Sequence, residues 1–347
     1  MLRRTFVAGT GVVALAQQAP AQARAKASVG IDLFSIRSSG YSPFEYLDYS
    51  AKLGGQVVHF SEIRFIGGLE PDHLRKVRAY ADKLGISLEL GMRSICPSSA
   101  AFDASQGTAE QQIEKMLVSA KLVGAPLVRC FLGTMQDRTG KLPIEGHIEN
   151  TIKVLKNVRS KVLDSGLKMA IENHAGDMQG RELKSLVEGA GKDFVGVCLD
   201  SGNPLWVIED PRVTLETLAP YVITSHIRDT AVWRIPEGAA VQWVRMGEGN
   251  IGIEEYLKRF LELCPGKPIT LEIIVTGARK FPYHDPKFWE GYKNVPAWEF
   301  SRFVTLVDEG DVRNPPPPPP KDQQAQRERE DLEASVRWLQ SFLAKSA

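Results

Sequence analysis

The chain has 347 residues, of which 43% are hydrophobic and 24% are charged, and its formal net charge is +1. This composition is typical of a globular protein, and it offers no basic field for a phosphate backbone, so nucleic acid is excluded as a partner. The four cysteines lie far apart and form no CxxC pair, which excludes a zinc knuckle and a dense disulfide framework.

The first 25 residues have the order of an export signal. Arg3 and Arg4 precede an apolar run over residues 6–16, and Ala21-Gln22-Ala23 forms an A-x-A cleavage site. The apolar run is too short to be a permanent membrane span. The paired arginines resemble the twin-arginine export signal, and an ordinary secretory signal is the alternative. We therefore expect a periplasmic or secreted protein.

From residue 28 onward, apolar runs rich in β-branched residues alternate with amphipathic stretches that end at glycine. Nearly continuous apolar runs are typical of parallel strands covered by helices. Eight such units predict one (β/α)8 TIM barrel over residues 28–312. An open doubly wound sheet is the alternative, but no GxGxxG fingerprint follows the early strands. The predicted strands are 29–36, 57–60, 86–91, 127–132, 168–171, 195–199, 222–227 and 269–275.

The C-terminal part has a different composition. Six consecutive prolines, Pro315 to Pro320, predict an extended polyproline spacer inside a Pro-rich linker over residues 313–326. An apolar stripe then predicts an extra helix over residues 327–347. The sequence leaves open whether this helix docks on the barrel or on a partner subunit, and it therefore leaves a homo-oligomer open.

Acidic residues and a histidine lie at the ends of the last four predicted strands. Because the active site of a TIM barrel lies at the C-terminal ends of its strands, we expect these four side chains to converge. Three carboxylates and an imidazole would repel one another unless a cation lay among them. Such a donor set favours Mn²⁺, with Mg²⁺, Co²⁺ and Zn²⁺ as alternatives. The four residues are Glu172, Asp200, His226 and Glu272.

The same segments resemble a known family. The motifs are E-N-H at 172–174, L-D-x-G-N at 199–203, H-I-R-D at 226–229 and then "RMGEGNIGIEEYL", followed by Glu272. In this order they resemble the xylose-isomerase-like TIM barrels of the sugar phosphate isomerase/epimerase superfamily, over residues 29–303. The resemblance implies that the four convergent residues are metal ligands. It also implies that Glu172 and Glu272 form an acid/base pair that moves a proton next to a metal-bound carbonyl.

One position departs from the family pattern. Asn203 stands where the ketose epimerases of this family have a histidine, and an amide can bind a sugar hydroxyl but cannot shuttle a proton. His174 is a further catalytic candidate if it turns toward the pocket rather than away from it.

Four more residues are candidates for substrate binding. Asp229 could orient an imidazole, bind substrate or cap a loop, and Arg245 could clamp a substrate oxygen or lie exposed. His59 and Glu62 follow the second predicted strand and are pocket candidates.

These observations predict a divalent-metal-dependent sugar isomerase or epimerase that abstracts a proton next to a carbonyl. Phosphorylated sugars are scarce outside the cytoplasm, so the expected partner is an unphosphorylated sugar or keto-sugar. One alternative is a 3-keto-glycoside lyase that carries out β-elimination at the same metal site. A non-catalytic sugar-binding protein is the other.

Overall fold

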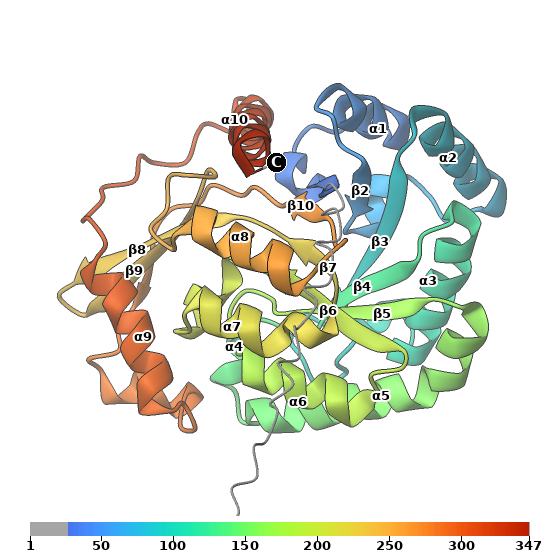
Figure 1. Cartoon of the computed structure of the whole chain (residues 1–347). Helices are drawn as coiled ribbons and strands as arrows, with labels where there is room; N and C mark the ends of the chain where they lie inside the picture. The colour runs from blue at the N-terminus through green and yellow to red at the C-terminus, as the bar shows by residue number, and fades with distance from the viewer. Residues whose placement is uncertain (1–26, 347) are drawn as a thin grey trace, which may run out of the picture.

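A computed structural model describes residues 27–346, and the export signal predicted over residues 1–25 lies outside this part. Eight parallel strands form one sheet in the order β10-β1-β2-β3-β4-β5-β6-β7. Ile227, directly after β7, pairs in parallel with Leu271 of β10, which closes the barrel and confirms the predicted fold class (Figure 1). The strands are β1 (Val29–Asp32), β2 (Val57–Phe60), β3 (Ser87–Ser94), β4 (Leu127–Phe131), β5 (Lys168–Glu172), β6 (Val195–Asp200), β7 (Val222–His226) and β10 (Ile269–Leu271).

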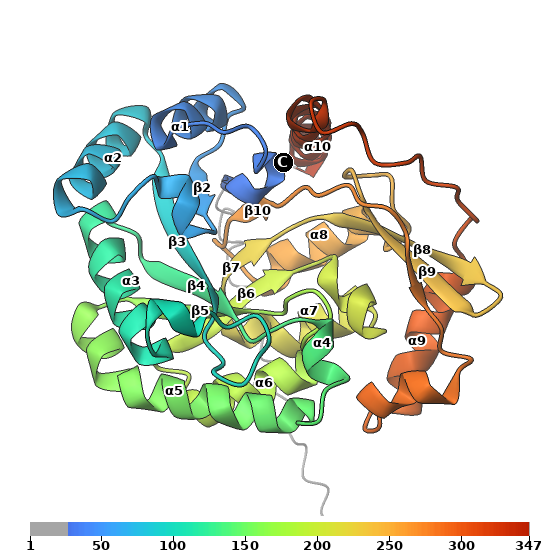
Figure 2. The ribbon, with the colours of Figure 1, turned by 180° about the vertical axis from the view of Figure 1, so that it is seen from behind.

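Helices surround this barrel on the outside (Figures 1 and 2). Several helices begin or end at signals that the sequence offers. Ser42 and Glu45 form a capping box at the start of α1. Gly85 ends α2 in the left-handed conformation, at φ 69°. The helices are α1 (Pro43–Lys52), α2 (Pro71–Leu84), α3 (Ala109–Val123), α4 (Met135–Arg138), α5 (Ile144–Ser165), α6 (Gly180–Ala190), α7 (Pro211–Leu218), α8 (Ile253–Leu263), α9 (Ala297–Asp308) and α10 (Gln324–Ser346).

The C-terminal helix α10 docks on its own barrel. It lies beside α1 and next to β10, where the ring of outer helices needs its eighth member (Figure 2). The Ser38 backbone N–H and hydroxyl donate to Glu328 at 2.8 and 2.9 Å, and Leu332 and Leu339 are fully buried. The helix that the sequence presents as an extra segment thus completes the (β/α)8 architecture. Among the described residues, no helix is long and apolar enough to cross a membrane.

An antiparallel sheet after β7 was not predicted. It consists of β8 (Asp229–Ile235), β9 (Gly238–Val244) and β11 (Arg279–Phe281), and α9 packs on β8. Strands β8 and β9 are joined by the two residues Pro236 and Glu237, so the signal available in the sequence was a pair of β-prone runs on either side of a short turn.

Candidate metal centre

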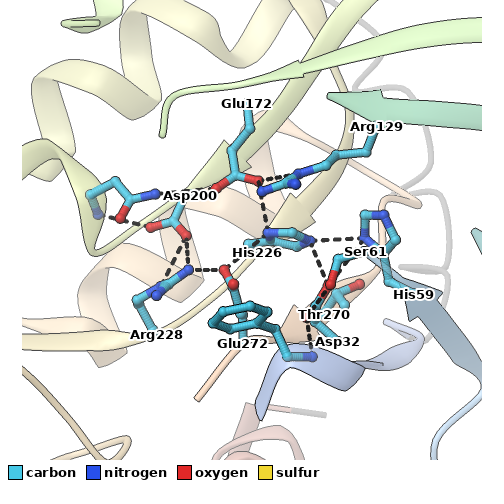
Figure 3. Close-up of polar contacts among 12 residues, drawn as sticks. Asp32, His59, Ser61, Arg129, Glu172, Asp200, His226, Arg228, Thr270 and Glu272 are labelled. Atoms are coloured by element: carbon cyan, nitrogen blue, oxygen red, sulfur yellow. Dashed lines mark hydrogen bonds and ion pairs between the residues drawn. The ribbon is translucent and has the colours of Figure 1, made fainter. Parts of the chain in front are cut away.

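The four residues predicted to converge do meet inside the barrel (Figure 3). Glu172, Asp200 and His226 end β5, β6 and β7, and Glu272 lies one residue beyond β10. One ligand atom from each lies within 4.8 Å of the others. The first three side chains are fully buried, and Glu272 is 5% exposed.

The contacts of the His226 ring suit a bound cation. Its Nδ1 lies 3.0 Å from Glu172 Oε2 and 3.1 Å from Glu272 Oε2, yet it has no hydrogen-bond partner of acceptable geometry among the described residues. Bonds of about 2.1 Å at right angles place neighbouring ligand atoms about 3.0 Å apart. The spacing and the unpartnered Nδ1 therefore both fit a divalent ion held by these side chains.

Two arginines contact three of these carboxylates. Arg129 of β4 donates from Nε to Glu172 Oε2 at 2.5 Å. Arg228 donates from Nη2 to Asp200 Oδ2 at 2.7 Å and also contacts Glu272, and its guanidinium lies 4.5 Å from the centre of the Trp243 ring. Its Nη1 has no hydrogen-bond partner among the described residues. The arginines thus neutralise part of the negative charge and hold the carboxylates in place.

The negative charge that the two arginines leave unbalanced also indicates a site for a divalent ion. Four buried carboxylates, those of Glu172, Asp200, Glu272 and the neighbouring Asp32, face two guanidinium groups. When His226 is neutral, this leaves two negative charges in a buried site, where unpaired charge is costly. One divalent ion would balance them, so the donor set and the charge both fit such an ion.

The pKa values follow from the same contacts. Burial alone would raise the pKa of Glu172, but the positive charges of Arg129 and His226 outweigh it and hold that pKa well below its usual range. Burial raises the pKa of Asp200 in spite of Arg228. Burial would lower the pKa of His226, but Cys198, Glu172 and Asp32 together raise it well above its usual value. In the absence of a metal ion, a proton on His226 thus supplies part of the missing positive charge.

Asp32, His59 and Glu89 form a second polar row beside the four residues. They lie in register on β1, β2 and β3. His59 Nδ1 lies 2.8 Å from His226 Nε2, so the structure brings this predicted residue to the back of the His226 ring. Burial raises the pKa of Glu89 to about 7.

Sequence reasoning missed Asp32, Glu89, Arg129 and Arg228. The available signal was a charged residue inside or directly beside an apolar run predicted as a buried strand. Such a residue is rarely buried unless it is paired, so it marks a position that faces a polar barrel interior.

Two further predicted residues lie near Glu172: Asn203 contacts it, and His174 interacts with its charge. Asn203 donates from Nδ2 to Glu172 Oε1 at 3.2 Å and to the Asn173 carbonyl at 2.9 Å. His174 is partly buried and stacks on Phe131, with ring centres 4.0 Å apart. Its Nδ1 contacts the Gly133 carbonyl at 2.9 Å and must donate there, so Nε2 carries the lone pair. Burial lowers the pKa of His174 to about 4, which keeps the ring neutral.

The other three predicted residues have partners elsewhere. Asp229 accepts hydrogen bonds from the backbone N–H groups of Gly247 and Gly249 at 3.0 and 2.9 Å, so it caps a loop. Arg245 donates to Asp331 of α10 at 2.6 Å and helps to dock that helix. Glu62 pairs with Arg64 at 2.5 Å near the surface.

A cavity of about 750 Å³ lies between the barrel and the C-terminal segment. Ile273 and Val275, which follow Glu272, form one wall, and the proline segment 315–319 and Glu328 of α10 form another. The linker and the last helix therefore border open space close to the end of β10.

Comparison with known proteins gives the class of this barrel. The model of the xylose isomerase-like TIM barrel family matches residues 46–288, and the chain belongs to this family. A curated relative, 3-oxo-isoapionate decarboxylase from Pectobacterium atrosepticum, is 25% identical over 188 residues. That match covers 54% of this chain and 61% of the relative's length.

Solved structures with the same fold include a sugar epimerase and a zinc-bound protein. D-psicose 3-epimerase from Clostridium cellulolyticum H10, crystallised with D-tagatose, has a TM-score of 0.58 and 15% identity, over 80% of this chain and 95% of its own. The IOLI protein with a bound zinc atom has a TM-score of 0.54 and 16% identity, over 82% of this chain and all of its own. At these identities the likeness shows the fold alone.

Proposed function

We propose that the protein is a divalent-metal-dependent sugar isomerase or epimerase that moves a proton at a carbon next to a carbonyl. The observation that carries the proposal is the arrangement of Glu172, Asp200, His226 and Glu272, with an unpartnered Nδ1 and buried carboxylates that outnumber the guanidinium groups among them. Membership of the xylose isomerase-like family supports a sugar as substrate, and we take a keto-sugar as the form that supplies the carbonyl.

A divalent ion held by these four residues would draw electrons from the carbonyl and stabilise the negative charge that develops when the neighbouring C–H bond breaks. Among Mn²⁺, Mg²⁺, Co²⁺ and Zn²⁺, Mn²⁺ suits the three carboxylates and one imidazole best. Glu172 contacts Arg129, Asn203 and His226, and its low pKa makes it a weak base. We assign Glu172 to holding the ion rather than to moving the proton.

Glu272 and His174 are the residues we assign to proton transfer. Glu272 is 5% exposed, whereas the other three of the set are fully buried, so it is the member nearest to open space. His174 is neutral, and its Nδ1–H bond to Gly133 leaves the Nε2 lone pair free to accept a proton. A carboxylate and an imidazole next to the same centre are the usual means of general acid–base catalysis.

Asn203 favours a second candidate reaction at the same site. Both of its amide contacts go to the protein, to Glu172 and Asn173, and an amide cannot carry a proton to a second face of the substrate. One base is enough for β-elimination from a 3-keto-glycoside: the C–H bond next to the ketone breaks, its electrons form the C=C bond, and the glycosidic oxygen leaves and takes up a proton. The decarboxylation for which the relative is named also leaves electrons next to a carbonyl.

The export signal predicted over residues 1–25 belongs to this proposal. An enzyme outside the cytoplasm would meet unphosphorylated sugars and glycosides, so we propose these as the substrate class.

The first experiment is elemental analysis of the purified chain after incubation with Mn²⁺ or Zn²⁺. About one ion per chain is expected, and the Glu172→Ala/Asp200→Ala double variant should lose it. The control is Asp72→Ala/Glu290→Ala, which removes two exposed carboxylates and should keep the ion.

Turnover of keto-sugars followed by mass spectrometry then separates the two reactions. An isomerase or epimerase returns a product of unchanged mass, whereas a lyase releases a second molecule from a glycoside. If the wild type, like the Glu172→Ala/Asp200→Ala variant, binds no metal ion, the proposed function is wrong. The sugar-binding alternative then replaces it.

A further inference from the structure

The His226 ring has different partners on its two sides (Figure 3). Nδ1 faces Glu172 and Glu272 at 3.0 and 3.1 Å, while Nε2 faces His59 Nδ1 at 2.8 Å and Asp32 Oδ2 at 3.3 Å. Both sides contain a group of residues that could hold a metal ion: Glu172, Asp200, His226 and Glu272 on one, and Asp32, His59 and His226 on the other.

The two sides differ in their hydrogen bonding. The contact between Nε2 and His59 Nδ1 has hydrogen-bond geometry, and 2.8 Å is an ordinary distance for such a bond. Nδ1, in contrast, has two carboxylate oxygens nearby and no hydrogen-bond partner among the described residues. Nδ1 is therefore the nitrogen open to a cation, and with a cation there the single proton of the ring lies on Nε2, which donates to His59 Nδ1.

Asp32 is held so that one of its oxygens lies beside His226 Nε2. Its Oδ1 accepts hydrogen bonds from the Phe34 backbone N–H at 2.7 Å and from the Ser61 hydroxyl at 2.8 Å. Oδ2 is left without a hydrogen-bond partner of acceptable geometry, and it lies 3.3 Å from His226 Nε2 and 3.6 Å from His59 Nδ1. All of these side chains are buried, so water does not compete for the proton.

We propose that Asp32 and His59 are positioning residues that hold the proton of His226 on Nε2 and thereby direct Nδ1 toward the metal ion. If the proton moved to Nδ1, it would point between Glu172 and Glu272 and occupy the place of the cation. Such outer partners fix the tautomer and the orientation of a histidine ligand. The inference rests on the proposed function, because it requires an ion on the Nδ1 side.

The test is the affinity of the full chain for Zn²⁺, measured by competition with a chelating dye, in the wild type and in two variants. Asp32→Asn keeps the size of the side chain but can donate to Nε2, and we expect Zn²⁺ to bind about 10–100-fold more weakly. Asp72→Asn is the control, because it makes the same change at an exposed position; its affinity should stay close to that of the wild type.

Nitrogen NMR of the zinc-loaded wild type and of Asp32→Asn gives a second readout, because a merely structural role of Asp32 would leave zinc and the proton on the same His226 nitrogens in both proteins. The chain has six histidines, and the His226 signals can be assigned by their loss in His226→Asn. In the wild type we expect zinc on Nδ1 and the proton on Nε2, and in Asp32→Asn we expect this state to lose population. Zinc on Nε2, or an unchanged affinity in Asp32→Asn, would overturn the inference while leaving the proposed function in place. A wild type that binds no zinc would refute both.

Discussion

Arg129 donates a hydrogen bond from Nε to Glu172 Oε2 at 2.5 Å inside the barrel, where both side chains are almost completely buried. The bond joins neighbouring strands β4 and β5. Because removal of one partner of a buried ion pair leaves the other charge without compensation, this contact has a measurable consequence for stability.

Arg129→Met should lower the free energy of unfolding of the metal-free protein by about 3–5 kcal/mol, because Glu172 would be left as an unpaired buried charge. Chemical denaturation measures the difference. The control is Arg75→Met, whose partner Asp72 is exposed on the same helix, and its effect should stay below about 1 kcal/mol. Equal effects of the two variants would show that the buried pair adds nothing special.

His174→Asn should reduce kcat/KM about 10²–10⁴-fold on a substrate that the wild type converts, because the neutral imidazole is lost as a proton acceptor. The metal content should not change, since His174 lies outside the set of four residues that surround the ion. His284→Asn, at an exposed position, is the control. Full activity of His174→Asn would mean that the ring only packs on Phe131.

Stability should depend on pH through Glu209, a buried residue of the loop that precedes α7. Burial raises its pKa to about 7 from an ordinary value of about 4.5. Between these values the folded protein holds a proton that the unfolded chain has released, so stability falls as the pH rises through this range and the loss is complete above pH 7. Glu209→Gln removes this titration.

The free energy of unfolding of Glu209→Gln, relative to that of the wild type, should therefore rise by about 3 kcal/mol between pH 4.5 and pH 7. Denaturation curves at several pH values test this, with exposed Glu290→Gln as the control. A difference that does not change with pH would mean that Glu209 is ionised in the folded protein throughout.

Leu339→Ala should lower the global free energy of unfolding by about 2–5 kcal/mol, because Leu339 is fully buried where α10 packs on the barrel. The neighbouring control, Ser341→Ala, changes an exposed residue of the same helix. If Leu339→Ala released α10 without changing the main unfolding transition, the helix would be an appendage rather than the eighth helix of a cooperative fold.

Much of the architecture could be predicted because it depends on local periodicity. Each of the eight parallel strands begins within one residue of the start of a predicted run, since a strand buried on both faces must be apolar along its length. The β8–β9 hairpin was missed because its sequence pattern was not distinguished from that of a long loop with tryptophans and glycines. The packing site of α10 could not be predicted from the sequence, because the six prolines before it predict an extended segment but not where that segment leads.

The sequence by itself determined the barrel and the convergence of Glu172, Asp200, His226 and Glu272, because the carboxyl ends of parallel strands must meet at one end of the barrel. Only the tertiary structure decided which charges lie among them. The same centre is reached by Asp32 from β1, His59 from β2, Arg129 from β4 and Arg228 from the segment after β7. Strand register and side-chain direction decide whether such residues touch. The balance of charge at the centre depends on these contacts across strands, and for that reason it follows from packing and not from spacing along the chain.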